Sequence, residues 1–160
     1  DGKTVLLGGG ATVFPEWSPH IGEGAVGGNR VPMGTLALPE GIKVIGERAF
    51  SQCPNLWIIT IPSSVDSIGE YAFSYCRNLN VASLKGGGKK LAFGAFYECE
   101  KLVAIELPQG MESIGNIAFS HCTNLYSVSL PSSLQEVGFE SFEDCPCEKE
   151  VLQLVQKNKK

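Results

Sequence analysis

Residues 56–76 read LWIITIPSSVDSIGEYAFSYC, and this stretch indicates the fold. Ile59 and Ile61 lie two residues apart, which places both side chains on one face of a β-strand. Pro62 lacks the N–H that a strand ladder needs, so the strand is expected to end there. Ile68 then returns to the interior before the next turn. The stretch therefore predicts a strand followed by a return segment that packs against the same core.

The pattern recurs with a period of 23 residues. Five cysteines keep this spacing, namely Cys53, Cys76, Cys99, Cys122 and Cys145. The same spacing holds for Phe50, Phe73, Phe96, Phe119 and Phe142, and for Leu56, Leu79, Leu102 and Leu125. A fixed period of this length is typical of solenoids, in which each repeat is one coil that buries its apolar face against its neighbours. The aligned positions are therefore expected to stack inside the protein.

The period divides the chain into four parts. Residues 1–14 are expected to be an N-terminal extension, 15–38 a degenerate first repeat that caps the stack, 39–145 the regular repeats, and 146–160 a capping helix with a tail. In the last part, Val151, Leu152, Leu154 and Val155 are predicted to form one apolar stripe of the helix.

One repeat departs from the pattern. In Lys85–Leu107, Lys85 replaces the proline, Gly86–Gly88 replaces polar and apolar positions, and Ala92 stands where Gly69 is expected to allow a tight bend. The second strand of this coil is therefore predicted to be distorted. Gly86–Gly88 and the two lysines that follow lack the Ser or Thr and the helix of a phosphate-binding loop, so a flexible basic surface loop is expected.

Composition excludes several classes of protein. The 160 residues suit one folded unit with an apolar core, because 43% are hydrophobic and 19% are charged. The net charge of -4 shows no basic excess of the kind that nucleic-acid binding needs. No run approaches a membrane span, and residues 1–10 do not resemble a signal peptide. The absence of an initial Met is expected of a mature or trimmed chain, and such a chain is compatible with the earlier removal of a signal or anchor.

The cysteines and histidines give little support for catalysis, metal binding or a cofactor. One cysteine in each coil is expected to be a buried free thiol, although six cysteines also allow a metal site or disulfides. Cys145 and Cys147 are the one close pair, and a bridge between them would be strained. His20 and His121 lack the partners that acid–base catalysis needs, so both are interpreted as surface residues. We predict that the protein is not an enzyme.

With the unit L-x-x-I-x-I-P-x-x-V-x-x-I-G-x-x-A-F-x-x-C, as in Leu56–Cys76, the sequence resembles the BspA-like leucine-rich repeat family over residues 15–145. The resemblance implies an α/β repeat fold: a leucine-rich-repeat solenoid with a parallel β-sheet on the concave face, short irregular or helical convex segments and a C-terminal capping helix. It also implies an extracellular or cell-surface protein that binds other molecules as an adhesin does.

The exposed positions of the predicted sheet form the candidate partner-binding site, because adjacent strands place them in continuous columns. These residues are Trp57, Ile58, Thr60, Asn80, Val81, Ser83, Val103, Ala104, Glu106, Tyr126, Ser127 and Ser129. Several are aromatic or aliphatic, which is typical of interaction sites and also of ordinary strands. The expected partner is a protein or peptide, such as a host or extracellular-matrix protein. The alternative is a structural spacer that self-associates as a homo-oligomer.

Overall fold

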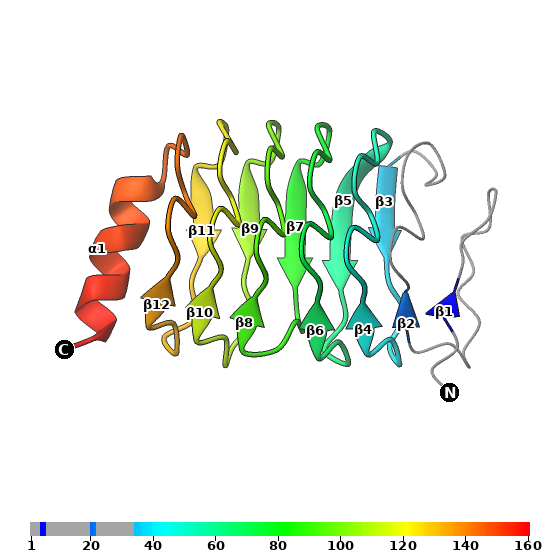
Figure 1. The fold of residues 1–160 in the computed structure, drawn as a ribbon, viewed down its shortest axis with the longest axis horizontal. Coiled ribbons are helices and arrows are strands. Elements are labelled where there is room, and N and C mark those ends of the chain that lie inside the picture. Colours follow the sequence, from blue (N-terminus) through cyan, green and yellow to red (C-terminus); the bar gives the residue numbers. More distant parts are fainter. Residues whose placement is uncertain (1–3, 6–19, 22–33) are drawn as a thin grey trace.

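The computed structural model describes residues 4–5, 20–21 and 34–160, and it shows a solenoid of stacked parallel strands (Figure 1). Each regular coil contributes one longer and one shorter strand. The longer strands form a five-stranded parallel sheet in the order β11-β9-β7-β5-β3. Their bounds are Gly34–Ala37 (β3), Leu56–Ile61 (β5), Val81–Leu84 (β7), Ala104–Glu106 (β9) and Ser127–Ser129 (β11). This confirms the predicted parallel solenoid.

The shorter strands line up in a second row. They are Thr4–Val5 (β1), His20–Ile21 (β2), Val44–Ile45 (β4), Ser67–Ile68 (β6), Lys90–Leu91 (β8), Ser113–Ile114 (β10) and Glu136–Val137 (β12). β1 pairs with β2, so the expected N-terminal extension contributes a strand to this row. Most of the predicted first repeat lies outside the described residues. Between residues 34 and 147 the segments that connect the strands are turns and bends, not helices.

The register of the sheet follows the sequence period. Ile58 pairs with Val81, and Val81 pairs with Ala104, so positions 23 residues apart lie side by side on neighbouring strands. Within β5, Leu56 and Ile59 are buried while Ile58 is exposed. The strand ends at Ile61, directly before Pro62, as the sequence predicted. The repeated columns of the sequence are therefore columns in space.

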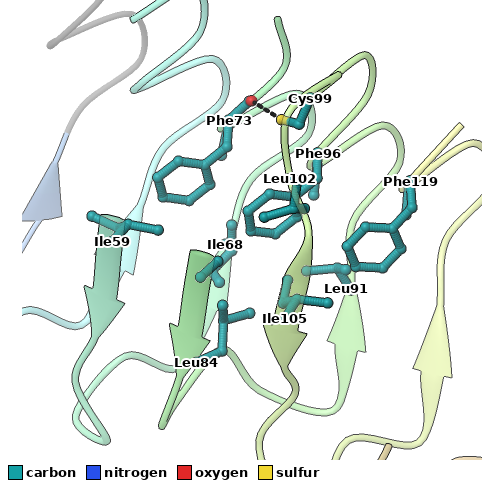
Figure 2. Packing of buried hydrophobic residues seen from close by; sticks show 14 of the residues in the cluster. Ile59, Ile68, Phe73, Leu84, Leu91, Phe96, Cys99, Leu102, Ile105 and Phe119 are labelled. Atoms are coloured by element: carbon teal, nitrogen blue, oxygen red, sulfur yellow. Dashed lines mark hydrogen bonds between the residues drawn. The ribbon is translucent and has the colours of Figure 1, made fainter. Parts of the chain in front are cut away.

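The phenylalanine column forms the centre of the core. All five rings are at most 2% exposed, and successive rings stack with centroids 5.0–5.5 Å apart. Figure 2 shows Phe73, Phe96 and Phe119 in this row, with Ile68, Leu84 and Leu91 around them. Offset stacking adds to the free energy that burial of these large apolar side chains contributes. The stack joins each coil to the next.

The cysteine column connects the coils by hydrogen bonds. The Cys99 thiol donates to the Phe73 carbonyl at 3.1 Å (Figure 2), and the thiols of Cys76, Cys122 and Cys145 donate in the same way to Phe50, Phe96 and Phe119. All six cysteines are buried, and none of them forms a disulfide in the described structure. The prediction of buried free thiols is confirmed, and the hydrogen bond explains why a cysteine suits this position. A small side chain that is apolar and also donates weakly satisfies a buried carbonyl.

The second row of strands is interrupted in one place. It consists of a four-stranded sheet that ends at β6 and a three-stranded sheet that begins at β8. A Cβ built on Gly69 would lie 2.5 Å from the Glu47 nitrogen, so this position has room only for glycine. Ala92 carries such a Cβ at the equivalent place, and in this coil the short strand β8 does not pair with β6. The second strand of this coil forms and pairs with β10, so the departure that the structure shows is the missing pairing to β6. The glycine serves close approach between coils rather than a tight bend.

The glycine-rich stretch of the same coil is not a surface loop, so that expectation was wrong. Gly86 and Gly87 are buried, and the Gly87 N–H donates to the Val65 carbonyl at 2.8 Å. A Cβ on Gly86 would lie 2.4 Å from the Pro62 carbonyl oxygen. Glycine replaces the usual side chains here because the backbone itself packs against the preceding coil. Lys89 and Lys90, which follow, are exposed as expected.

The helix α1 (Glu148–Asn158) covers the C-terminal end of the stack (Figure 1). Val151 and Val155 are buried, which confirms the capping helix. Leu152 and Leu154 are 43% and 39% exposed, so the predicted four-residue stripe was too wide. Residues four apart differ by only about 40° around a helix, whereas Leu152 and Leu154 point well away from the Val151–Val155 line. Two side chains are enough to close the last coil.

Candidate partner-binding surface

The outward face of the five-stranded sheet brings the predicted site residues together; we call it the long-sheet face. Trp57 is 47% exposed, Ile58 39%, Val103 39% and Tyr126 64%. They come from the coils of β5, β9 and β11, and strands in a sheet lie about 4.8 Å apart. Val81 lies between them and is half-buried. These side chains therefore form one apolar band across the beginning of the strands.

The other half of the long-sheet face is polar. It holds Thr60, Ser83, Glu106 and Ser129, one from each of four successive strands. The Ser83 hydroxyl donates to a Glu106 carboxylate oxygen at 3.0 Å, and Lys85 lies 3.4 Å from the same oxygen. These two contacts hold the pKa of Glu106 below its usual value, the Ser83 hydrogen bond first and the lysine second. The acid is therefore fixed in position on the surface.

The remaining predicted residues contribute less contact area. Ala104 is half-buried, and Ser127 is exposed at the far end of the face. Asn80 is exposed, and its side-chain amide donates to the Lys101 carbonyl at 3.3 Å. The face thus changes from apolar at Ile58 to hydrophilic at Ser127 along one row of the sheet.

An open hollow of about 520 Å³ lies beside Trp57. It is lined by Pro54, Asn55, Trp57, Ile58, Asn78, Asn80 and Lys101. Lys101 donates to the Asn78 side-chain oxygen at 3.0 Å, and Asn78 donates to the Pro54 carbonyl at 2.7 Å. Sequence reasoning missed Asn78 and Lys101. The signal that could have found them is a fourth repeated column, Asn55, Asn78, Lys101 and Asn124, which precedes the strands.

The turns on the other side of the coils contain two columns with left-handed backbone. One is Arg48, Tyr71, Gly94, Ile117 and Glu140, and the other is Gln52, Tyr75, Glu98, His121 and Asp144, with φ between 49° and 62° throughout. The sequence placed His121 on the surface as a freely solvated residue. It is partly exposed there, but its Nδ1 lies 2.7 Å from an Asp144 oxygen, and its ring packs against Tyr97 with centroids 5.8 Å apart. His20 is also expected on the surface, but its side chain lies outside the described structure.

The described residues offer no arrangement for metal chemistry, since they contain no group of three or more His, Cys, Asp and Glu that could hold an ion. Cys145 and Cys147 are both buried, and no disulfide joins them. Among the parts of the chain that the structure describes, no helix has the length and apolar content that a membrane crossing requires.

Comparisons with known proteins agree with this architecture. The sequence-family model of the BspA type leucine rich repeat region matches residues 14–110 and 89–156, with six copies of the repeat. This model describes a repeat region and names no enzyme. No curated protein gives a match.

Several solved structures share the fold. A leucine rich cell surface protein from Faecalibacterium prausnitzii is 27% identical with a TM-score of 0.68, over 80% of this chain and 35% of that one. Leucine-rich repeat proteins from Bacteroides ovatus and Eubacterium ventriosum are 23% and 19% identical, with TM-scores of 0.63 and 0.67 over 84% and 82% of this chain. The chain spans 40% and 41% of those two structures, so all three relatives are much longer. On its sequence period, its stacked coils and the match of the repeat model, the chain belongs to the family of BspA-type leucine-rich repeat proteins.

Proposed function

We propose that the protein binds a protein or peptide partner through the long-sheet face. The observation that supports this is the band of exposed apolar side chains that includes Trp57, Ile58, Val103 and Tyr126. Exposed aromatic and aliphatic side chains that lie together are typical of interface centres, and large apolar patches on a monomer usually mark interaction sites. The parallel sheet holds them on a rigid base, so little conformational entropy is lost on binding.

The polar half of the face supports the same proposal. Thr60, Ser83 and Ser129 offer hydroxyl groups beside the apolar band, and Glu106 is already fixed by hydrogen bonds. An apolar centre with a polar rim is the usual anatomy of a protein interface. We place the protein at the cell surface or outside the cell, as an adhesin-like molecule that meets host or extracellular-matrix proteins. The Faecalibacterium prausnitzii relative is itself a cell surface protein.

The experiment compares three purified proteins: the wild type, Ile58→Asp and Leu154→Asp. Each is immobilised and exposed to an extracellular-matrix extract, and captured proteins are identified by mass spectrometry. The affinity of the principal one is then measured by surface plasmon resonance. Ile58 and Leu154 are equally exposed apolar residues on different faces. We expect Ile58→Asp to weaken binding at least about 10-fold, because a carboxylate must be desolvated in the interface. Equal binding by all three proteins would contradict the proposal.

A second copy of the chain would cover the same band if the protein were a self-associating spacer. Light scattering separates the two functions. We expect a monomer for the wild type. A dimer that dissociates on Ile58→Asp and persists in Leu154→Asp would favour the spacer and count against the proposed binding of another protein.

A further inference from the structure

A second exposed surface lies on the outward side of the three-stranded sheet β8-β10-β12; we call it the short-sheet surface. It consists of Glu70, Lys90, Phe93, Glu136, Phe139 and Glu140. An open hollow of about 530 Å³ lies on it, and its lining includes Glu70, Lys90, Phe93 and Glu136. It comes from the return strands of the coils, so it is separate from the long-sheet face and independent of the function proposed above.

Two phenylalanines stand out on this surface. Phe93 is 36% exposed and Phe139 is 71% exposed, although the phenylalanines of the core column are buried. Both occupy one repeated position, with Asn116 between them, at which Glu47 and Glu70 stand in the earlier coils. At about 4.8 Å for each strand, their backbones lie about 10 Å apart. The two rings thus occupy a position where the other coils carry polar side chains.

The surrounding contacts hold these residues in place. The Phe139 N–H donates to the Asn116 side-chain oxygen at 2.8 Å, and its carbonyl accepts from the Ile117 N–H at 2.9 Å. The Phe93 ring packs edge-on against the Tyr71 ring with centroids 5.4 Å apart. The Arg48 guanidinium lies over the Tyr71 ring, 4.6 Å from its centroid. The aromatic rings are therefore attached to rigid backbone.

Glycine forms part of the floor between the two rings. Gly115 and Gly138 line the hollow, and a Cβ on either would lie within 2.8 Å of atoms in the preceding coil. Glycine at these points lets neighbouring coils pack closely, and its backbone lines the hollow. Ser113 also lines the hollow and adds a hydroxyl group.

Charge decides what kind of ligand fits. Residues 131–147 contain four acidic residues and no Lys or Arg. Two of these acids have partners, since Glu143 accepts from the Ser120 hydroxyl at 3.3 Å and Asp144 pairs with His121. Glu136 and Glu140 are exposed beside Phe139, and neither takes part in a salt bridge among the described residues. Two carboxylates without a salt bridge among the described residues therefore lie on the same surface as Phe139.

We propose that the short-sheet surface binds a basic peptide segment in which Lys or Arg residues alternate with apolar ones. The cationic side chains would pair with Glu136 and Glu140, and they would also lie over the face of Phe139, where the ring quadrupole attracts a cation. The apolar side chains would enter the hollow beside Phe93. Lys90 carries the one positive charge among the residues that line the hollow, and it favours an approach of the cations from the Glu136 side.

Fluorescence anisotropy tests this with two labelled decapeptides, one of alternating Arg and Leu and one of alternating Glu and Leu. The wild type is expected to bind the Arg-Leu peptide at least about 10-fold more tightly, with an affinity that falls as NaCl screens the charges. The double variant Glu136→Gln with Glu140→Gln is expected to bind that peptide at least about 10-fold more weakly. Phe139→Ser is expected to have a comparable effect through the loss of the ring. The matched control, Glu148→Gln with Glu150→Gln in α1, removes two charges from another site and is expected to leave binding unchanged.

The outcomes that overturn the proposal are distinct. Equal binding of the two peptides, or equal losses in the Glu136/Glu140 and Glu148/Glu150 variants, would show that net charge alone attracts the peptide. A dimer in light scattering that dissociates on Phe139→Ser would mean that a second copy of the chain covers the surface. Ile58→Asp is expected to bind the Arg-Leu peptide like the wild type, so failure of the long-sheet proposal and failure of this one can be told apart. Circular dichroism confirms that each variant is folded.

Discussion

At the scale of single residues, the same amino acid has opposite roles at different positions of the coil. Phe119 is fully buried between Phe96 and Phe142, whereas Phe139 is 71% exposed on the short-sheet surface. The difference follows from position in the 23-residue period and not from the chemistry of the side chain. Burial removes nearly all of the Phe119 side chain from water, and this transfer is the main favourable term of folding.

The two phenylalanines give a matched test of this assignment. Phe119→Ala is expected to lower the free energy of unfolding by about 3–5 kcal/mol, because it removes a buried ring and leaves a cavity. Phe139→Ala is expected to stay within about 0.5 kcal/mol of the wild type, as exposed substitutions do. Urea denaturation followed by circular dichroism measures both. Equal effects would contradict the placement of one ring inside and the other outside.

At the scale of the elements, the distance between neighbouring coils is set by glycine. A Cβ on Gly115 would lie 2.8 Å from the Leu91 carbonyl oxygen, and the Gly115 N–H donates to that same oxygen at 2.7 Å. The contact is thus both a hydrogen bond and a steric limit. Where Ala92 replaces glycine, the short strands β6 and β8 are no longer paired. The Ala92 methyl group stands where the other coils have this close backbone contact.

Gly115→Ala is therefore expected to reproduce the interruption one coil later. The added Cβ should force the two backbones apart and lower the free energy of unfolding by about 1–3 kcal/mol, the usual range for overpacking. Amide hydrogen exchange should also show faster exchange at Gly115. Ala92→Gly is the control, because it removes a Cβ at the equivalent position, and its effect should stay within about 1 kcal/mol, the backbone cost of glycine. Unchanged exchange at Gly115 would contradict the steric argument.

The capping helix makes a second prediction at the same scale. Val155→Asp is expected to lower the free energy of unfolding by at least about 2 kcal/mol, because it buries an unpaired charge against the last coil. Leu152→Asp, on the exposed side of α1, is expected to change it by no more than about 0.5 kcal/mol. Thermal unfolding of the two variants provides the comparison. A larger effect for Leu152→Asp would mean that the helix packs by a different face.

At the scale of the whole molecule, one core runs through all the regular coils, and its thiols make stability depend on pH. Burial raises the pKa of the Cys99 and Cys122 thiols above their usual value. An unfolded cysteine titrates near 8.5, so above that pH the unfolded chain loses protons that the folded chain keeps. The unfolded state then binds fewer protons than the native state, and the free energy of unfolding falls as pH rises.

The expected slope for each such thiol averages about -1 kcal/mol per pH unit over the first unit above the unfolded pKa, and it approaches about -1.4 kcal/mol per pH unit at higher pH. Urea denaturation between about pH 8.5 and 9.5 measures this slope. The range stays below about pH 10, near which tyrosines and lysines titrate. The double variant Cys99→Ala with Cys122→Ala should be less stable at neutral pH, because it lacks two buried side chains, but its slope in this range should be shallower by about 2 kcal/mol per pH unit. The same slope in wild type and variant would contradict the effect of burial on these two thiols.

The sequence determined the coil. The 23-residue period fixed which side chains stack, because every repeat must place its apolar residues against the same core. It therefore predicted the buried cysteines, the end of the strand before Pro62 and the helix that buries Val151 and Val155. It also grouped the residues of the long-sheet face, since equal positions lie side by side once the strands are paired in register.

Only the tertiary structure decided how closely the coils approach and what each surface exposes. It showed that Gly86 and Gly87 are buried, that Leu152 and Leu154 face away from the core, and that His121 pairs with Asp144. It also showed the two surfaces on which Trp57 and Phe139 lie. A period specifies neighbours along one column, whereas exposure, backbone contact and ion pairing depend on distances between columns. Those distances exist only after the coils have packed.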